Sequence, residues 1–202
     1  VIGDLMIDDV RDIIFTRTKR AAAVVADELA QRGFSVGAVH GDMDQTARER
    51  SLSAFREGTV EILVATDVAA RGIDVDDVTH VINHQVPDDP MTFVHRIGRT
   101  GRAGHTGTAV TLVGYDELSK WRIINDELDL GQPEPPQWFS TSPELAEALA
   151  IPADAEDTVG PATKVLGAPR RSPSSRRSAT DSARASRRTR SRKRNSRQGG
   201  RR

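Results

Sequence analysis

The sequence has no cysteine and few aromatic residues, which make up 4% of its 202 residues. Without cysteine the chain can form neither disulfides nor thiolate–metal sites, and a reducing compartment is allowed. No apolar run approaches the ~20 residues that a bilayer-spanning helix needs, and no signal-peptide pattern opens the chain. We therefore predict a cytoplasmic protein with no membrane contact.

The formal net charge of the chain is zero, because 29 lysines and arginines balance 29 aspartates and glutamates. This balance hides two unlike parts of the chain. Residues 170–202 contain 14 Lys or Arg against one acid, a net charge of +13, which leaves residues 1–169 at −13. We predict an acidic globular body and a disordered arginine-rich tail that is attracted to polyphosphates such as RNA. The simpler alternative is that the tail only solubilises the protein.

Short apolar segments alternate with amphipathic ones along the first two thirds of the chain. We expect strands at residues 12–16, 34–39, 60–65, 78–83 and 107–113, and helices at residues 18–33, 44–57, 90–97 and 116–128. Strands alternating with helices through short loops predict an α/β fold with a parallel sheet flanked by helices. Ligands bind such sheets at the carboxyl ends of the strands. Polar clusters follow the first three strands, in Thr16–Lys19, His40–Asp42 and a loop at Thr66–Asp74, so they are expected to converge.

The character of the sequence changes after residue 131, where a proline-rich stretch begins. We expect one or two helical turns near residues 142–149, and packing of Trp138 and Phe139 against the body. From about Ala153 onward the apolar content is too low to support a core, which predicts disorder. The expected division is a globular lobe, a proline-containing extension and linker, and a basic tail, at residues 1–131, 132–168 and 169–202.

Three arginines recur at every third residue within HRIGRTGR, residues 95–102: Arg96, Arg99 and Arg102. Guanidinium groups are always charged and costly to bury unpaired, so these residues would make a poor core. Their planar fork suits phosphate oxygens, and the glycines between them let a ligand approach the backbone. Such a cluster could supply arginine fingers to a nucleoside triphosphate, and a solvated basic turn is the alternative.

Four stretches together resemble the second RecA-like lobe of a DEAD-box RNA helicase, over about residues 11–130. They are IIFTRTK (13–19), HGDMDQTAR (40–48), ATDVAARGIDV (65–75) and HRIGRTGRAG (95–104). The resemblance implies a RecA-like sheet and the use of ATP with Mg²⁺, held mainly by a first lobe. It makes Arg99 and Arg102 the arginine fingers, and places Asp74 and Gly72 in contact with the nucleotide, Asp74 at the ribose hydroxyls.

The same resemblance assigns two further roles. His95 and Arg71 would couple this lobe to its partner lobe, and His95 would also belong to the catalytic set. Gln85 departs from the pattern, because many family members have Asp at that position. Asp67 has a simpler interpretation as a residue that caps a turn.

The resemblance also implies an RNA-binding set, made up of Thr18, Gly41, Gln45, Arg48 and Thr66. Hydroxyls, a glycine amide and an arginine at a helix start can hold phosphates without reading bases. RNA binding should therefore be largely independent of sequence. Without the resemblance, Gln45 and Arg48 would be read as surface residues of a helix's first turn.

Two motifs of a complete helicase are missing from the sequence. It has no G-x-x-x-x-G-K-[ST] phosphate loop and no acidic magnesium motif, which belong to the family's first lobe. We expect the C-terminal part of a longer, monomeric ATP-dependent RNA helicase, inactive alone, and no metal site of its own. A non-catalytic RNA-binding module and a lobe of a DNA helicase of the same superfamily remain as alternatives.

Overall fold

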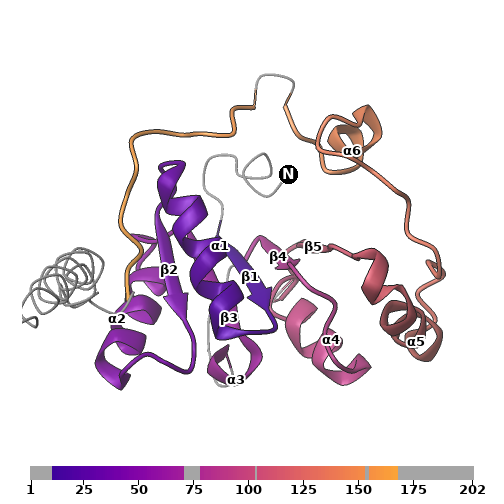
Figure 1. Cartoon of the computed structure of the whole chain (residues 1–202), viewed down its shortest axis with the longest axis horizontal. Helices are drawn as coiled ribbons and strands as arrows, with labels where there is room; N and C mark the ends of the chain where they lie inside the picture. Colours follow the sequence, from indigo (N-terminus) through magenta and orange to yellow (C-terminus); the bar gives the residue numbers. More distant parts are fainter. Residues whose placement is uncertain (1–10, 71–77, 103, 153–154, 168–202) are drawn as a thin grey trace, which may run out of the picture. The chain divides into compact units, whose positions relative to one another are not determined.

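The computed structural model describes residues 11–70, 78–102, 104–152 and 155–167, which all lie in one compact unit. These residues form a five-stranded parallel sheet, in the order β2-β3-β1-β4-β5, with helices packed against it (Figure 1). The strands are β1 (Asp12–Thr16), β2 (Val36–Val39), β3 (Ile62–Thr66), β4 (His80–Asn83) and β5 (Thr108–Thr111). The predicted parallel α/β sheet is confirmed, and the predicted basic tail lies outside the described residues.

The helices begin and end largely where the sequence predicts. They are α1 (Lys19–Gln31), α2 (Gln45–Arg56), α3 (Asp67–Ala70), α4 (Pro90–Ile97), α5 (Leu118–Leu128) and α6 (Pro143–Ala148). The Thr18 hydroxyl accepts a hydrogen bond from the Ala21 amide at 3.1 Å, which caps α1. Asp44 caps α2 in the same way, through the Ala47 amide at 2.7 Å.

Two apolar clusters cover the opposite faces of the sheet. Alternate residues of a strand point to opposite faces, so neighbours in β1 belong to different clusters. Ile14 packs with Val64 and the buried stripe of α1, whereas Ile13 packs with Leu63 and the side of α2. The central strands β1 and β3 are buried along their whole length, which explains why they read as unbroken apolar runs.

A third cluster joins α4 to α5 beyond the sheet. It contains Val86, Phe93, Trp121 and Ile124, and the Phe93 and Trp121 rings meet edge to face with centroids 5.8 Å apart. In the part of the chain that the structure describes, none of the helices combines the length and apolar content needed to cross a membrane. This cluster holds α4, and with it the start of the arginine-rich stretch, at the side of the sheet.

Two local predictions are wrong. The residues directly after β3 form a short helix, α3, instead of the start of a loop. Trp138 and Phe139 are not buried against the body, because these residues are 41% and 75% exposed. The proline-rich stretch before Phe139 bonds to α5, where Trp121 Nε1 donates to the Gln132 carbonyl at 2.7 Å. The predicted helical turns near residue 145 are confirmed as α6.

The predicted disorder beyond Ala153 is also wrong for residues 159–167, which we call the strap. The strap returns to β2, at the edge of the sheet (Figure 1). The Leu166 amide donates to the Val36 carbonyl at 2.9 Å, and the Ala38 amide donates to the Leu166 carbonyl at 3.1 Å. Val165 and Leu166 pack against the clusters on opposite faces of the sheet. Backbone pairing and two apolar side chains thus order a segment of low apolar content.

Candidate functional site

The carboxyl ends of the parallel strands lie level with one another and form one edge, here called the carboxyl edge. Thr16 pairs with Thr66 at the ends of β1 and β3, and Val39 pairs with Ala65. Segments that leave different strands therefore meet at this edge. The predicted site residues within the described ranges come together there, from the ends of β1, β2 and β3 and from the helix that follows β4.

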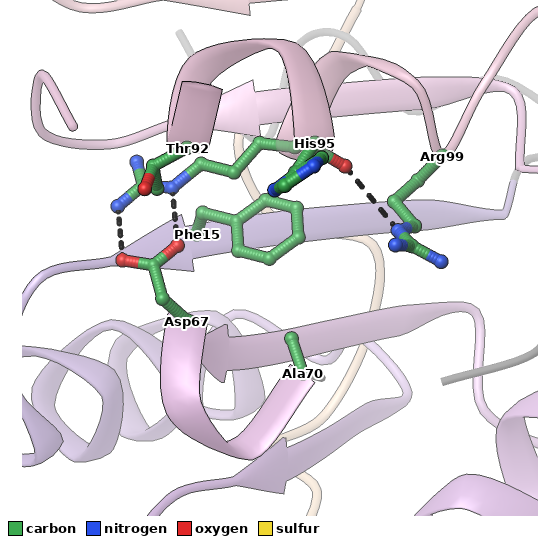
Figure 2. A pocket seen from close by; sticks show the side chains of 7 residues that line it. Phe15, Asp67, Ala70, Thr92, His95 and Arg99 are labelled. Carbon is green, nitrogen blue, oxygen red and sulfur yellow. Dashed lines mark hydrogen bonds and ion pairs between the residues drawn. The ribbon is translucent and has the colours of Figure 1, made fainter. Parts of the chain in front are cut away.

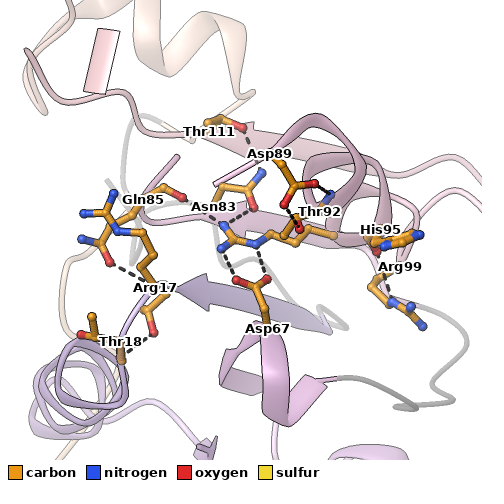
Figure 3. Close-up of polar contacts among 12 residues, drawn as sticks. Arg17, Thr18, Asp67, Asn83, Gln85, Asp89, Thr92, His95, Arg99 and Thr111 are labelled. Atoms are coloured by element: carbon orange, nitrogen blue, oxygen red, sulfur yellow. Dashed lines mark hydrogen bonds and ion pairs between the residues drawn. The ribbon is translucent and has the colours of Figure 1, made fainter. Parts of the chain in front are cut away.

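Arg96 is the centre of the polar contacts at this edge, although its side chain is only 1% exposed. Its Nε and one terminal nitrogen donate to the two carboxylate oxygens of Asp67, at 2.6 and 2.7 Å (Figure 3). The other terminal nitrogen donates to the Asn83 side chain at 3.1 Å and to the Gln85 carbonyl at 3.0 Å. The guanidinium carbon also lies 5.3 Å from the centroid of the Phe15 ring.

This arrangement corrects two interpretations of the sequence. Arg96 does belong to the core, because Asp67 neutralises it and four hydrogen bonds satisfy its fork. Asp67 is more than a turn cap, because it binds Arg96 through both oxygens. Together they tie α4 to the carboxyl ends of β1, β3 and β4, and so fix the position of the residues just after Arg96.

Next to this pair lies an open cavity of about 300 Å³ (Figure 2). Its lining combines apolar groups with cationic ones: Phe15, Asp67, Ala70, Thr92, His95, Arg96 and Arg99. His95 is exposed and Arg99 is half-buried, so both remain on the surface of the lobe. The cavity therefore brings together two of the residues assigned to catalysis by the resemblance.

The two predicted fingers fold back on the end of α4. Arg99 Nε donates to the His95 carbonyl at 3.3 Å, and Arg102 Nε donates to the Gly98 carbonyl at 2.7 Å. Cations are favoured at a helix C-terminus because the last carbonyls lack partners. Arg102 is exposed, and both guanidiniums stay near the same turn.

Thr100 anchors the loop that carries these arginines to the segment before β4. The sequence analysis did not identify this residue. Its hydroxyl donates to the carbonyls of Val78 and Thr79, the latter at 3.1 Å. Gly107 lies against the same loop, where an added Cβ would overlap Thr100. Because these partners come from a distant part of the chain, sequence spacing gave no signal for them.

The predicted RNA-binding residues lie at the ends of β1, β2 and β3 and in the helices that follow β1 and β2. Gly41 and Gln45 are exposed, Thr18 is exposed and caps α1, and Thr66 is buried at the end of β3. Arg48 is half-buried and donates to the Ala69 carbonyl of α3 at 2.8 Å. The short helix α3 therefore touches both the RNA-binding set and the Arg96 contacts.

The protonation state of His40 affects the charge beside the RNA-binding set. His40, which precedes Gly41, is only 6% exposed, and its burial lowers the pKa of the imidazole. A neutral His40 adds no positive charge to this edge at neutral pH.

Gln85, the departure from the family pattern, accepts a hydrogen bond from the Arg17 amide at 3.0 Å. The neutral side chain thus links the segments that follow β1 and β4.

His80 is part of the sheet, at the start of β4. His80 lies 3.0 Å from the buried Asp12 carboxylate, a contact that raises the pKa of His80. Within the described ranges, no group of three or more His, Cys, Asp or Glu side chains could hold a metal ion. Arg71, Gly72 and Asp74, predicted to couple the lobes and bind nucleotide, lie outside the described residues.

The sequence is similar to those of known helicases. Residues 4–104 match the family described as the helicase conserved C-terminal domain. The chain is 53% identical over 112 residues to the DEAD-box ATP-dependent RNA helicase CshA of Bacillus subtilis, covering 55% of this chain and 23% of CshA. Its identity to the ATP-dependent RNA helicase DeaD of Mycobacterium tuberculosis is also 53% over 112 residues, covering 55% of this chain and 20% of DeaD.

Solved structures show the same fold. The C-terminal domain of the DEAD-box protein Dbp5 matches with a TM-score of 0.58 and 36% identity, over 63% of this chain and 74% of that domain. The E. coli DEAD-box protein SrmB, solved with the regulator of ribonuclease activity A, matches with a TM-score of 0.59 and 34% identity, over 68% and 86% of the two chains. The RecA-like architecture is thus confirmed, and the matched region spans about a quarter or less of the curated relatives' length.

Proposed function

The chain belongs to the helicase conserved C-terminal domain family and corresponds to the C-terminal lobe of a DEAD-box RNA helicase. From this premise we propose that it binds the RNA backbone and supplies Arg99 and Arg102 to ATP with Mg²⁺, held mainly by a first lobe. One observation supports this proposal above all. The RNA-binding set and the arginines lie on one edge of one sheet, linked through α3.

The chemistry of the two arginines suits the transfer of a phosphoryl group. Negative charge spreads over the γ-phosphate oxygens in the transition state, and a guanidinium placed there stabilises it. Arg99 is half-buried and Arg102 is exposed, and both follow the buried Arg96, so a nucleotide on a partner lobe could reach their side chains. In this proposal His95 and Arg71 couple the lobes, and Asp74 with Gly72 contacts the ribose side of the nucleotide.

The RNA-binding set suits recognition of phosphates and not of bases. Thr18, Gly41, Gln45, Arg48 and Thr66 come from the ends of three neighbouring strands and the helices that follow. Hydroxyls, amides and one arginine along such an edge can follow a single-stranded backbone without reading its sequence. The proposed substrate is therefore RNA of no fixed sequence, bound by a monomer in the cytoplasm.

The first test is whether the 202-residue chain hydrolyses ATP by itself. We expect no RNA-stimulated phosphate release, because the chain lacks a phosphate loop and an acidic magnesium motif. Adding a first lobe should restore release. RNA-dependent release by the purified chain, abolished by Arg99→Ala, would contradict the division of labour between two lobes.

A second test separates binding by the basic segment, residues 170–202, from binding by the carboxyl edge. Each phosphate neutralised on a single strand contributes about −0.7 to the slope of log K against log salt. If the 14 cations of this segment engage about six phosphates, affinity falls roughly 300-fold over about a fourfold rise in salt.

The measurement is a fluorescence-anisotropy titration with single-stranded RNA at several salt concentrations. Removing residues 170–202 should flatten the slope sharply and weaken binding. Arg48→Ala in the full chain should change the slope by about one unit at most. An unchanged slope after the truncation would mean that the basic segment does not bind RNA.

A further inference from the structure

The loop that joins β2 to α2, residues 40–44, carries part of the proposed RNA-binding set; we call it the β2–α2 loop. It contains Gly41 and leads directly into α2, which carries two more members of the set. The Met43 amide donates to the His40 carbonyl at 3.2 Å, and the His40 amide donates to the Met43 sulfur at 3.3 Å. The position of the Gly41 amide therefore depends on where the Met43 side chain is held.

The end of the strap lies against the Met43 side chain. Met43 is half-buried, and a Cβ added at Gly167 would overlap both the end of the Met43 side chain and the Ser51 hydroxyl of α2. Gly167 also has φ of +84°, in the left-handed region that residues other than glycine rarely adopt. A glycine at this position thus lets the strap approach the β2–α2 loop closely.

The strap is itself firmly held, so it can act as a support. The Leu166 amide donates to the Val36 carbonyl at 2.9 Å, and the Leu166 carbonyl accepts from the Ala38 amide and the Ser51 hydroxyl, both at 3.1 Å. This pairing with β2 is parallel, so the strap runs toward the carboxyl edge. Thr163 donates through its amide and its hydroxyl to carbonyls at the end of α1 and just beyond it, at 2.7 and 2.6 Å. The strap thus joins β2, α1 and α2.

An ion pair ties the β2–α2 loop to α1. Lys19 Nζ lies 2.7 Å from the Asp42 carboxylate, and the two side chains are 60% and 56% exposed. Exposed pairs of this kind contribute little to stability and are screened by salt. The buried hydrogen bonds of the strap therefore make it the firmer support of the loop.

We propose that Leu166 and Gly167 are positioning residues for RNA binding. They hold the Met43 side chain, and through it they fix the Gly41 amide and the start of α2 in the arrangement that receives RNA phosphates. This inference rests on the proposed RNA binding and gives a role to the end of the strap.

The role predicts an effect on RNA binding and not on the use of ATP. A binding loop that is already ordered loses less conformational freedom when its ligand binds, so loosening it weakens the affinity. Arg99 and Arg102 fold back on the end of α4, through contacts that involve neither the strap nor the β2–α2 loop. Loosening the β2–α2 loop should therefore leave the nucleotide steps unchanged.

The experiment measures RNA-stimulated ATP hydrolysis by the two-lobe protein, titrated with a short single-stranded RNA. It compares the unchanged protein with Gly167→Ala, Met43→Ala and the double variant. The matched control is Gly58→Ala, at the opposite end of α2, where φ is +73° and an added Cβ meets no atom within 4 Å. The control shares the backbone strain of Gly167→Ala without its overlap.

We expect Gly167→Ala and Met43→Ala each to raise the RNA concentration for half-maximal stimulation about fivefold. The kcat at saturating RNA and the KM for ATP should stay within about twofold of the original values. The double variant should be no weaker than the weaker single variant, because both substitutions disturb the same contact. Gly58→Ala should leave the half-maximal RNA concentration unchanged.

A strap that only stabilised the fold would lower the folded fraction, and so the rate, without moving the half-maximal RNA concentration. If Gly167→Ala or Met43→Ala keeps the original RNA concentration, or if their effects add in the double variant, the proposal is overturned while RNA binding stands. Should Gly167→Ala fail to fold, Met43→Ala decides the matter alone. If RNA does not stimulate the unchanged two-lobe protein, the proposed function itself is wrong.

Discussion

Replacing Asp67 by alanine should destabilise the lobe by about 3–5 kcal/mol, because the substitution leaves the Arg96 guanidinium buried without its counter-charge. Arg96 is 1% exposed, so water replaces the lost carboxylate poorly. Two hydrogen bonds, at 2.6 and 2.7 Å, disappear at the same time. The loss should appear as a lower midpoint of urea unfolding with an unchanged slope.

The Asp67 side chain is 29% exposed, which predicts an asymmetry between the partners. Arg96→Met should cost less than Asp67→Ala, because the remaining carboxylate can reach water. The double variant Asp67→Ala/Arg96→Met should recover part of the free energy of unfolding that Asp67→Ala loses. Replacing both partners of a buried ion pair by apolar residues is often well tolerated.

The chain provides a matched control in a surface ion pair. Lys120 and Asp88 are 2.6 Å apart, with side chains 30% and 68% exposed. Asp88→Ala should therefore cost no more than about 1 kcal/mol. If Asp67→Ala lowers the free energy of unfolding no more than Asp88→Ala does, Arg96 and Asp67 do not hold α4 in place.

The elements that the sequence predicted well are those with local signals. The bounds of β1 follow from an unbroken apolar run between polar residues, and α1 follows from the Thr18 cap and an apolar stripe at helical spacing. The convergence of the site at one edge follows from the parallel order of strands and helices, because parallel strands place their carboxyl ends together.

The features that the sequence did not predict depend on contacts between distant residues. Arg96 pairs with Asp67, 29 residues earlier in the chain, and only the order of β3, β1 and β4 in the sheet makes them neighbours. The strap was predicted to be disordered because its apolar content is low. Its order comes from backbone hydrogen bonds to β2 and to the end of α1, which composition does not reveal.

The catalytic prediction for Arg102 applies to a protein that contains both lobes. Arg102→Ala should lower kcat by on the order of 10³ with little change in KM, because a finger acts mainly in the transition state. Lysine should not rescue activity, since it lacks the bidentate fork. The substitution should leave the fold unchanged, because Arg102 is exposed at the end of α4.

The most direct measurement of the central claim is the steady-state rate of RNA-stimulated ATP hydrolysis by the two-lobe protein carrying Arg99→Ala. The matched control is Arg122→Ala, which removes an arginine of α5 whose side chain is 52% exposed and paired with Glu134. We expect Arg99→Ala to lower kcat by on the order of 10³ while KM for ATP and the affinity for RNA stay close to their original values, and the control to keep its full rate. A near-normal kcat for Arg99→Ala would show that this lobe does not supply Arg99 to the nucleotide.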